Sequence, residues 1–274
     1  MPEHYRRTYC LFALAIFFSA CTSLKPVNDF AAASLLGAQK FESLPVSYQS
    51  LCLDNCREQD IKNGKLNPSN CDCKAARLAD SVDGLFYKTL AAYLDGLARL
   101  SAGGTTDYKF DGVSDQLTGL GVSAADAGAY AKLGGVLTKA ITDGYRKGKT
   151  RAYIREANGP LQTIIAHLKA NIGTSLAIDL NAATGKLESD YFDLVRNSKG
   201  NAYEQRKIIE EFYAIKADRD SQLKALKAYA ALLQTIADGH QQLAENPGDL
   251  KAMLIQYASN IKDIRTQIQI LNKK

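Results

Sequence analysis

Apolar residues recur at steps of three and four positions along most of this chain. The clearest repeats span residues 78–100, 161–194, 208–240 and 250–271, and the last of these keeps a strict 4-3 heptad. Such spacing places apolar side chains on one face of an α-helix, and no comparable stretch alternates apolar and polar residues as a strand does. The pattern predicts an all-α fold built from long helices.

Turn-forming residues mark where these helices start and end. Gly103-Gly104 is predicted to end the first long helix, and Ser123 is predicted to cap the start of another. Asn158-Gly159-Pro160 and Asn246-Pro247 predict breaks, each followed by a helix with proline in its first turn. Short connections make consecutive helices antiparallel neighbours, so we expect an elongated antiparallel helical bundle over residues 74–274.

The beginning of the chain follows a different pattern. A short helix is predicted over residues 28–43, and another, further along, over residues 113–117. Residues 46–70 carry turn formers such as Asn63-Gly64 and are the only part after the first 20 residues that is predicted to be non-helical. We therefore expect residues 29–73 to form an N-terminal segment with a cysteine-rich loop.

The first residues carry the pattern of an exported protein. Arg6-Arg7 precedes an apolar run of about ten residues that ends in small residues before a cysteine. This run is shorter than the about 20 residues that a membrane-spanning helix needs. Phe18-Ser19-Ala20-Cys21 resembles the lipobox of bacterial lipoproteins, although that family usually has Leu at the Phe18 position.

The resemblance implies that residues 1–20 are removed and that Cys21 is acylated and becomes the first residue of the mature chain. Lipoproteins with Asp at the next position stay at the inner membrane, and this chain has Thr22, so the resemblance implies the outer membrane. Residues 21–28 would then form a lipid-anchored tether, with the rest of the chain facing the periplasm. The alternative is a plain secretory signal with an unrelated cysteine; the rest of a twin-arginine pattern is missing.

Four further cysteines form two close pairs, Cys52-x3-Cys56 and Cys71-x-Cys73. Exported chains meet an oxidising compartment, where an even number of cysteines predicts disulfides. A bond within each pair conflicts with disulfide geometry, so we expect either Cys52–Cys73 with Cys56–Cys71 or the crossed alternative. A four-thiolate zinc or copper site is the competing interpretation, but C-x2-C spacing is missing and no histidine is near. We therefore predict disulfides and no metal.

One basic cluster interrupts the balanced charge pattern. Its members are Arg146, Lys147, Lys149, Arg151 and Arg155. Such a cluster can contact anionic headgroups, phosphates or an acidic partner. The alternative, which we favour, is a solvated turn whose cations interact with a helix C-terminus.

Composition and motifs argue against several function classes. The formal charge is +5, and removal of the signal segment leaves it close to neutral for this length, so no nucleic-acid partner is expected. His167 and His240 lack neighbouring ligands at metal spacing, and Glu210-Glu211 is predicted to lie on a solvated helix side. Arg219 stands at an otherwise apolar position of its repeat, which indicates a buried polar layer or a device that sets the register of the bundle. Motifs for nucleophilic hydrolysis, phosphate binding and calcium binding are missing, so no enzyme and no cofactor is predicted.

These observations together predict an envelope lipoprotein that acts as a non-enzymatic binding or scaffold module. It would be held at the membrane through its lipid anchor and would present helical surfaces to an envelope protein partner. The alternative is a periplasmic immunity or inhibitor lipoprotein that neutralises a toxin or enzyme.

Overall fold

The computed structural model describes residues 24–103, 117–120, 122–142, 150–198 and 201–245, together with six residues between 258 and 269. Throughout these described residues the regular elements are helices, and no strand occurs. The prediction of an all-α chain is therefore confirmed.

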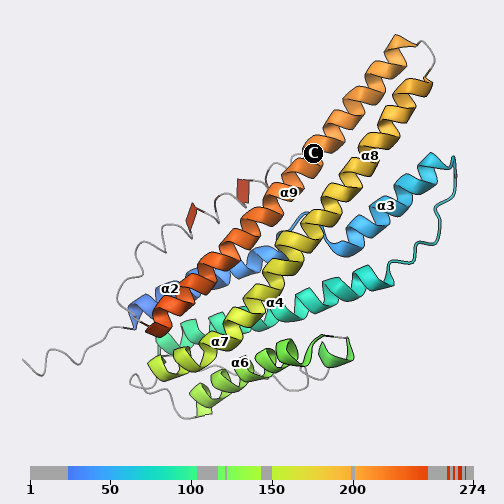
Figure 1. Ribbon diagram of the computed structural model, residues 1–274. Coiled ribbons are helices and arrows are strands. Elements are labelled where there is room, and N and C mark those ends of the chain that lie inside the picture. The colour runs from blue at the N-terminus through green and yellow to red at the C-terminus, as the bar shows by residue number, and fades with distance from the viewer. Residues whose placement is uncertain are drawn as a thin grey trace, which may run out of the picture.

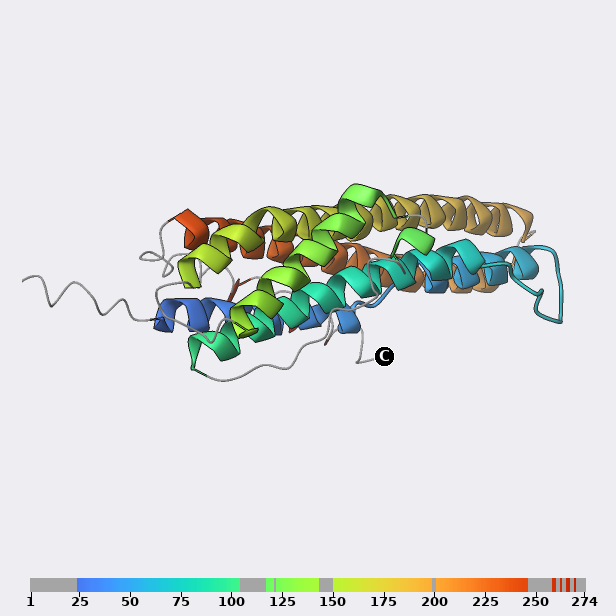
Figure 2. The ribbon, with the colours of Figure 1, turned by 90° about the horizontal axis from the view of Figure 1, so that it is seen from below.

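The helices form an elongated bundle (Figures 1 and 2). In chain order they are α2 (Lys25–Ala38), the 3-10 turn η2 (Gln39–Ser43), α3 (Tyr48–Lys62), α4 (Lys74–Ser101), α6 (Ala124–Thr142), α7 (Thr150–Leu168), the π-helical segment η4 (Lys169–Leu176), α8 (Ala177–Asn197) and α9 (Ala202–Glu245). α2 packs on α4, α7 packs on α6 and α9, and α8 packs on α9. None of the described helices is both long and apolar enough to cross a bilayer.

The apolar core lies where α2, α4, α7 and α9 meet. Its largest fully buried side chains include Phe86 and Leu90 of α4, Leu161 and Ile165 of α7, and Tyr229 of α9. Most of them occupy the three- and four-residue repeats that predicted these helices. Burying each such side chain stabilises the fold by about 1.5–3 kcal/mol. The region where these four helices meet is therefore the stable part of the bundle.

The break predicted at Asn158-Gly159-Pro160 is wrong, because α7 continues through Pro160. Proline removes one backbone N–H from the helix and normally disrupts it. Here Ala157 and Leu161 on either side are completely buried, and the Asn158 side chain binds His240 of α9 and does not cap a helix. Tertiary packing of α7 therefore outweighs its local stop signal. The helical path then runs on through η4 into α8 without a turn.

The prediction that residues 46–70 are non-helical is also wrong, since α3 occupies most of that segment. Ser47 and Ser50 form a capping box, with Ser47 Oγ accepting the Ser50 backbone N–H at 3.2 Å. The Asp80 carboxylate of α4 accepts the backbone N–H groups of Tyr48 and Gln49, each at 2.9 Å. Polar caps and covalent links hold α3 in place, so this helix does not need an apolar stripe. Its sequence therefore lacked the periodicity by which the other helices were predicted.

Other predicted helix ends agree with the structure. Gly103 follows α4 with φ +81°, a conformation that glycine adopts without strain. Ser123 Oγ accepts the Asp126 backbone N–H at 3.2 Å and so caps α6. Most of the helix predicted over residues 113–117, and nearly all of the heptad over residues 250–271, lie outside the described residues.

Candidate functional site

Two disulfides join α3 to the chain just before α4. Cys52 pairs with Cys73 at a Cα–Cα distance of 5.9 Å, and Cys56 pairs with Cys71 at 6.2 Å. The uncrossed pairing is thus the one that forms, and the predicted disulfides are confirmed. All four sulfur atoms are used in these bonds. No group of three or more His, Cys, Asp or Glu among the described residues is placed to hold a metal ion.

Polar contacts fix the other side of α3 to α8 and α9. The Arg219 guanidinium of α9 pairs with the Asp54 carboxylate of α3 at 3.2 Å, and only 13% of the Arg219 side chain is exposed. Lys62 at the end of α3 pairs with Asp190 of α8. The arginine at an apolar position of the repeat therefore serves as a link between α9 and α3.

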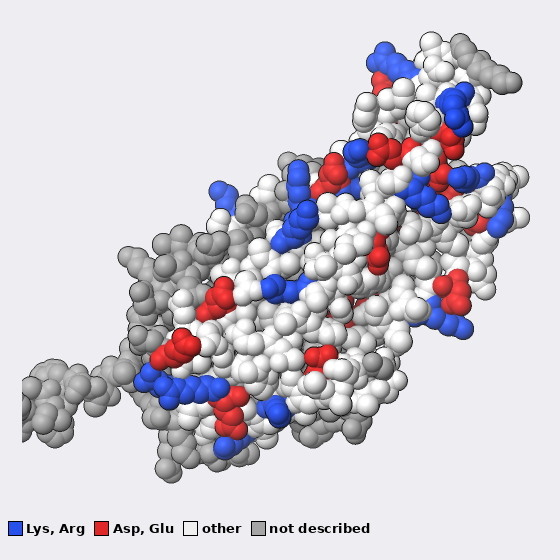
Figure 3. All heavy atoms as spheres, in the orientation of Figure 1, with Lys and Arg blue, Asp and Glu red and all other residues white. Residues whose placement is uncertain are grey.

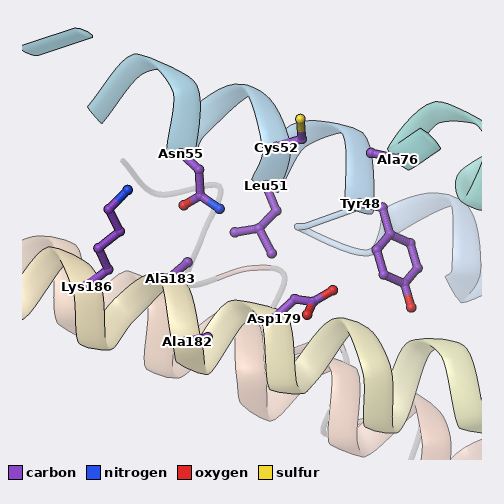
Figure 4. Close-up of a pocket in the computed structure, with 9 residues that line it drawn as sticks. All are labelled: Tyr48, Leu51, Cys52, Asn55, Ala76, Asp179, Ala182, Ala183 and Lys186. Atoms are coloured by element: carbon purple, nitrogen blue, oxygen red, sulfur yellow. The ribbon is translucent and has the colours of Figure 1, made fainter. Parts of the chain in front are cut away.

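A pocket of about 410 Å³ separates α3 from α8 (Figure 4). Its lining residues are Tyr48, Leu51, Cys52, Asn55, Ala76, Asp179, Ala182, Ala183 and Lys186. Tyr48 and Asp179 lie at one end, whereas Asn55 and Lys186 lie at the other (Figure 4). The sequence did not predict this pocket, because it predicted no helix at α3. Without α3 the pocket has no second wall opposite α8.

Behind Tyr48 lies a partly buried polar cluster, in which Asp83 is the buried member. The Tyr48 hydroxyl donates to the Asn171 carbonyl oxygen at 2.9 Å, and Asn171 Nδ2 donates to Asp83 Oδ1 at 2.8 Å. Asn171 Nδ2 also lies 3.0 Å from His167 Nε2, and His167 Nδ1 lies 3.7 Å from an Asp126 carboxylate oxygen. Asn171 belongs to the π-helical segment η4, a conformation that often accompanies functional positions.

Burial sets the proton affinities in this cluster. It raises the pKa of Asp83 to about 6, because the charged carboxylate loses solvation in the core. It lowers the pKa of His167, an effect that the nearby Asp126 carboxylate opposes. Asp83 therefore holds a proton more readily than an exposed carboxylate does, and Asn171 connects it through hydrogen bonds to Tyr48 at the pocket.

His240 has a packing role. Its ring is fully buried, with Nε2 2.7 Å from the Tyr93 hydroxyl and Nδ1 2.9 Å from Asn158 Oδ1. Because Asn158 Oδ1 only accepts hydrogen bonds, Nδ1 donates and Nε2 accepts from Tyr93. Burial lowers the pKa of His240 to about 3, so this ring is neutral at physiological pH.

Only two of the five residues of the basic cluster, Arg151 and Arg155, lie among the described residues. Arg146, Lys147 and Lys149 lie outside them. Arg151 Nη2 donates to the Glu245 carbonyl oxygen at 2.9 Å, and Arg155 Nε donates to the Ala244 carbonyl oxygen at 3.0 Å. Both arginines therefore satisfy the C-terminal carbonyl groups of α9, as the favoured interpretation expected of its cations. The predicted turn is wrong at these two positions, because Arg151 and Arg155 lie inside α7.

The end of the α8–α9 hairpin carries the main exposed aromatic surface among the described residues. Phe192 and Tyr203 are each 65% exposed, and Tyr213 is 64% exposed. No described residue from Glu188 to Lys224 is buried. This part, which we call the hairpin tip, touches α3 through Asp190 and Arg219, and its outer end extends beyond α3 and α4 (Figure 1). Glu210 and Glu211 are exposed on it as predicted.

A groove runs between the two helices of the hairpin tip. It encloses about 380 Å³ and is lined by Glu188, Tyr191, Phe192, Val195, Ile208, Ile209, Phe212, Tyr213 and Lys216. Cations border its aromatic floor, with Lys216 Nζ 5.7 Å from the Phe212 ring centre and Arg196 5.9 Å from that of Phe192. Basic and acidic side chains alternate over the visible face of the molecule (Figure 3), so no single sign of charge dominates there.

The predicted acylation site, Cys21, lies outside the described residues. No protein-family model matches this chain, and neither a curated protein nor a solved structure shows significant similarity to it. Its function is therefore inferred from its own residues.

Proposed function

We propose that this chain is an outer-membrane lipoprotein that acts as a non-enzymatic binding module, with the groove of the hairpin tip as its contact surface. The observation that carries this proposal is the exposure of Phe192, Tyr203 and Tyr213 beside a groove whose lining residues all belong to α8 and α9. Exposed apolar patches of this kind mark interaction sites in stable proteins.

The position of the hairpin tip supports a partner away from the anchoring membrane. α2 begins at Lys25, shortly after the predicted acylation site at Cys21, and this start lies at the opposite end of the bundle from the tip (Figures 1 and 2). α9 alone is about 66 Å long at the usual helical rise. A chain anchored through Cys21 would therefore hold its aromatic groove well out in the periplasm.

The groove fits an amphipathic helix of an envelope protein. Two antiparallel helices with an apolar seam between them lack, within the described part of the chain, the third helix that covers such seams elsewhere in this bundle. The rim carries both signs of charge, with Lys216 paired to Glu188 at 3.5 Å, which suits a helix of mixed charge better than a polyanion. Aromatic side chains of this type dominate binding energies at helix-in-groove interfaces.

A photo-crosslinking residue at Phe192, introduced in cells, tests the proposal. We expect one discrete adduct with an envelope protein, with the crosslink located on an amphipathic helix of that protein. Leu66, which is 99% exposed on the loop after α3, is the matched control position and should give no such adduct. A Tyr213→Asp change should abolish the adduct at Phe192.

Three results would overturn this assignment. They are adducts of the same pattern at both positions, a crosslink to a second copy of the chain, and a crosslink to lipid. Identification of the partner as a delivered toxin or an enzyme would instead assign the chain to the immunity or inhibitor class.

A further inference from the structure

The pocket between α3 and α8 has the same layout on both of its walls. On α8, Asp179 and Lys186 are seven positions apart and so lie on one face, about 10 Å apart along the helix axis. On α3, Tyr48 and Asn55 have the same spacing and stand opposite them (Figure 4). Each wall therefore has a polar side chain at both ends. One end of the pocket carries the negative charge of Asp179, and the other end carries the positive charge of Lys186.

The middle of the pocket is apolar and roomy. Ala182 and Ala183 of α8 face Leu51 of α3, next to the disulfide-bonded Cys52 (Figure 4). Large side chains usually fill the space between packed helices, so alanines at these positions leave it open. Collapse of α3 onto α8 is opposed by the two disulfides and by the Arg219–Asp54 ion pair. The pocket is thus formed before any ligand arrives, which reduces the entropic cost of binding.

We propose that this pocket binds a short peptide with free termini, about three residues long. An extended chain of three residues spans about 10 Å, which matches the rise of about 10 Å along α8 between Asp179 and Lys186. The peptide ammonium group would lie at the Asp179 carboxylate and the peptide carboxylate at the Lys186 ammonium group. Small side chains of the peptide would rest on the alanine floor.

The neighbouring polar groups suit this orientation. The Tyr48 hydroxyl donates its hydrogen to the Asn171 carbonyl oxygen and accepts a hydrogen bond from Ser175, so its oxygen keeps one lone pair that can accept from an ammonium group. At the other end, the Asn55 amide offers donors to a carboxylate. Lys186 Nζ donates to Gln59 Oε1 at 3.1 Å and has two further hydrogens for the ligand.

Calorimetric titration of the mature, oxidised protein with Ala-Ala-Ala tests the proposal. We expect saturable binding, with an affinity at least about fivefold lower for N-acetylated Ala-Ala-Ala and for Ala-Ala-Ala amide, because each lacks one charge. Asp179→Asn should weaken binding of the free peptide by a similar factor but leave the affinity for the acetylated peptide unchanged. Lys186→Gln should show the mirror behaviour with the amide.

Matched controls separate this proposal from general charge effects. Asp220→Asn and Lys224→Gln change exposed charges on α9 outside the pocket and should leave the affinity for Ala-Ala-Ala unchanged. Equal affinities for free and blocked peptides, or no saturable binding up to about 10 mM, would overturn the proposal. Phe192→Asp should not alter peptide binding, so failure of the hairpin-tip proposal and failure of this one are distinguishable.

Discussion

The Tyr93 hydroxyl of α4 lies 2.7 Å from Nε2 of His240 of α9, and both side chains are buried in the core. The other ring nitrogen of His240 is held by Asn158 of α7 at 2.9 Å. One neutral imidazole therefore joins three helices that are far apart in the sequence. Such a connection makes the stability of the bundle depend on the protonation of this ring.

Stability should fall at acid pH because of His240. Its pKa is about 3 in the folded chain, and the unfolded value is near 6.5, so the unfolded chain binds the proton more readily. The contribution is complete above pH 6.5 and is lost at about 1.4 kcal/mol per pH unit as the pH falls toward 3. Urea unfolding of the wild type and of His240→Gln at several pH values measures it. An unchanged pH slope in the variant would contradict this account.

Asp83 should make the free energy of unfolding change with pH in the direction opposite to the effect of His240. Its pKa is raised from 3.8 to about 6 by burial, so its favourable contribution is complete below 3.8 and is lost as the pH rises through 6. Asp83→Asn keeps an oxygen that can accept from Asn171 but removes the buried charge. We expect it to raise the free energy of unfolding by up to about 3 kcal/mol at pH 8 and by little at pH 4. Equal effects at both pH values would argue against this.

Reduction of the disulfides should release α3 before the rest of the bundle. Leu51 is the one apolar residue that α3 buries, so little besides the covalent links and polar contacts holds it. Each bond closes a loop of 15 or 21 residues and contributes about 3 kcal/mol in the chain-entropy description. Hydrogen exchange should accelerate over residues 48–62 after reduction, while residues 82–97 of α4 keep their protection. Uniform acceleration throughout would show that α3 is not a separate unit.

Substitutions at the hairpin tip should separate binding from stability. Phe192→Ala removes a side chain that is 65% exposed, so we expect a change of less than about 0.5 kcal/mol in the free energy of unfolding. Leu233→Ala, at a fully buried position of the same hairpin, should cost about 2–5 kcal/mol. Denaturant titration gives both values, and crosslinking from Tyr213 reports binding. Loss of stability in Phe192→Ala similar to that in Leu233→Ala would mean that the tip belongs to the core.

The lipid anchor is tested at Cys21. Cys21→Ser should abolish metabolic labelling with palmitate and release the chain from the membrane fraction, because acylation of the cysteine is what the lipobox resemblance implies. Labelling that persists in the variant would contradict the anchor, and Cys52→Ser serves as the control that should remain labelled.

Much of the fold could be predicted from local patterns. The helical repeats around Phe86, Leu161 and Leu233 identified α4, α7 and α9, since burial of one face leaves a period of three to four residues in the sequence. Pairing between the cysteine clusters followed from their spacing and the geometry of the bond. The sequence did not decide between Cys52–Cys73 and the crossed alternative, because both pairings were compatible with the spacing.

The tertiary structure decided what the local signals left open or indicated wrongly. Pro160 lies inside α7 because buried neighbours compensate for its missing N–H, and α3 is helical because Asp80 and two disulfides replace an apolar face. Asp83 and Asn171 come together only when α4 packs beside η4, so no sequence motif predicts their cluster. The pocket at Asp179 likewise needs two walls from separate parts of the chain. Local sequence specifies which face of a helix is apolar, but the contacts between helices determine which polar groups meet.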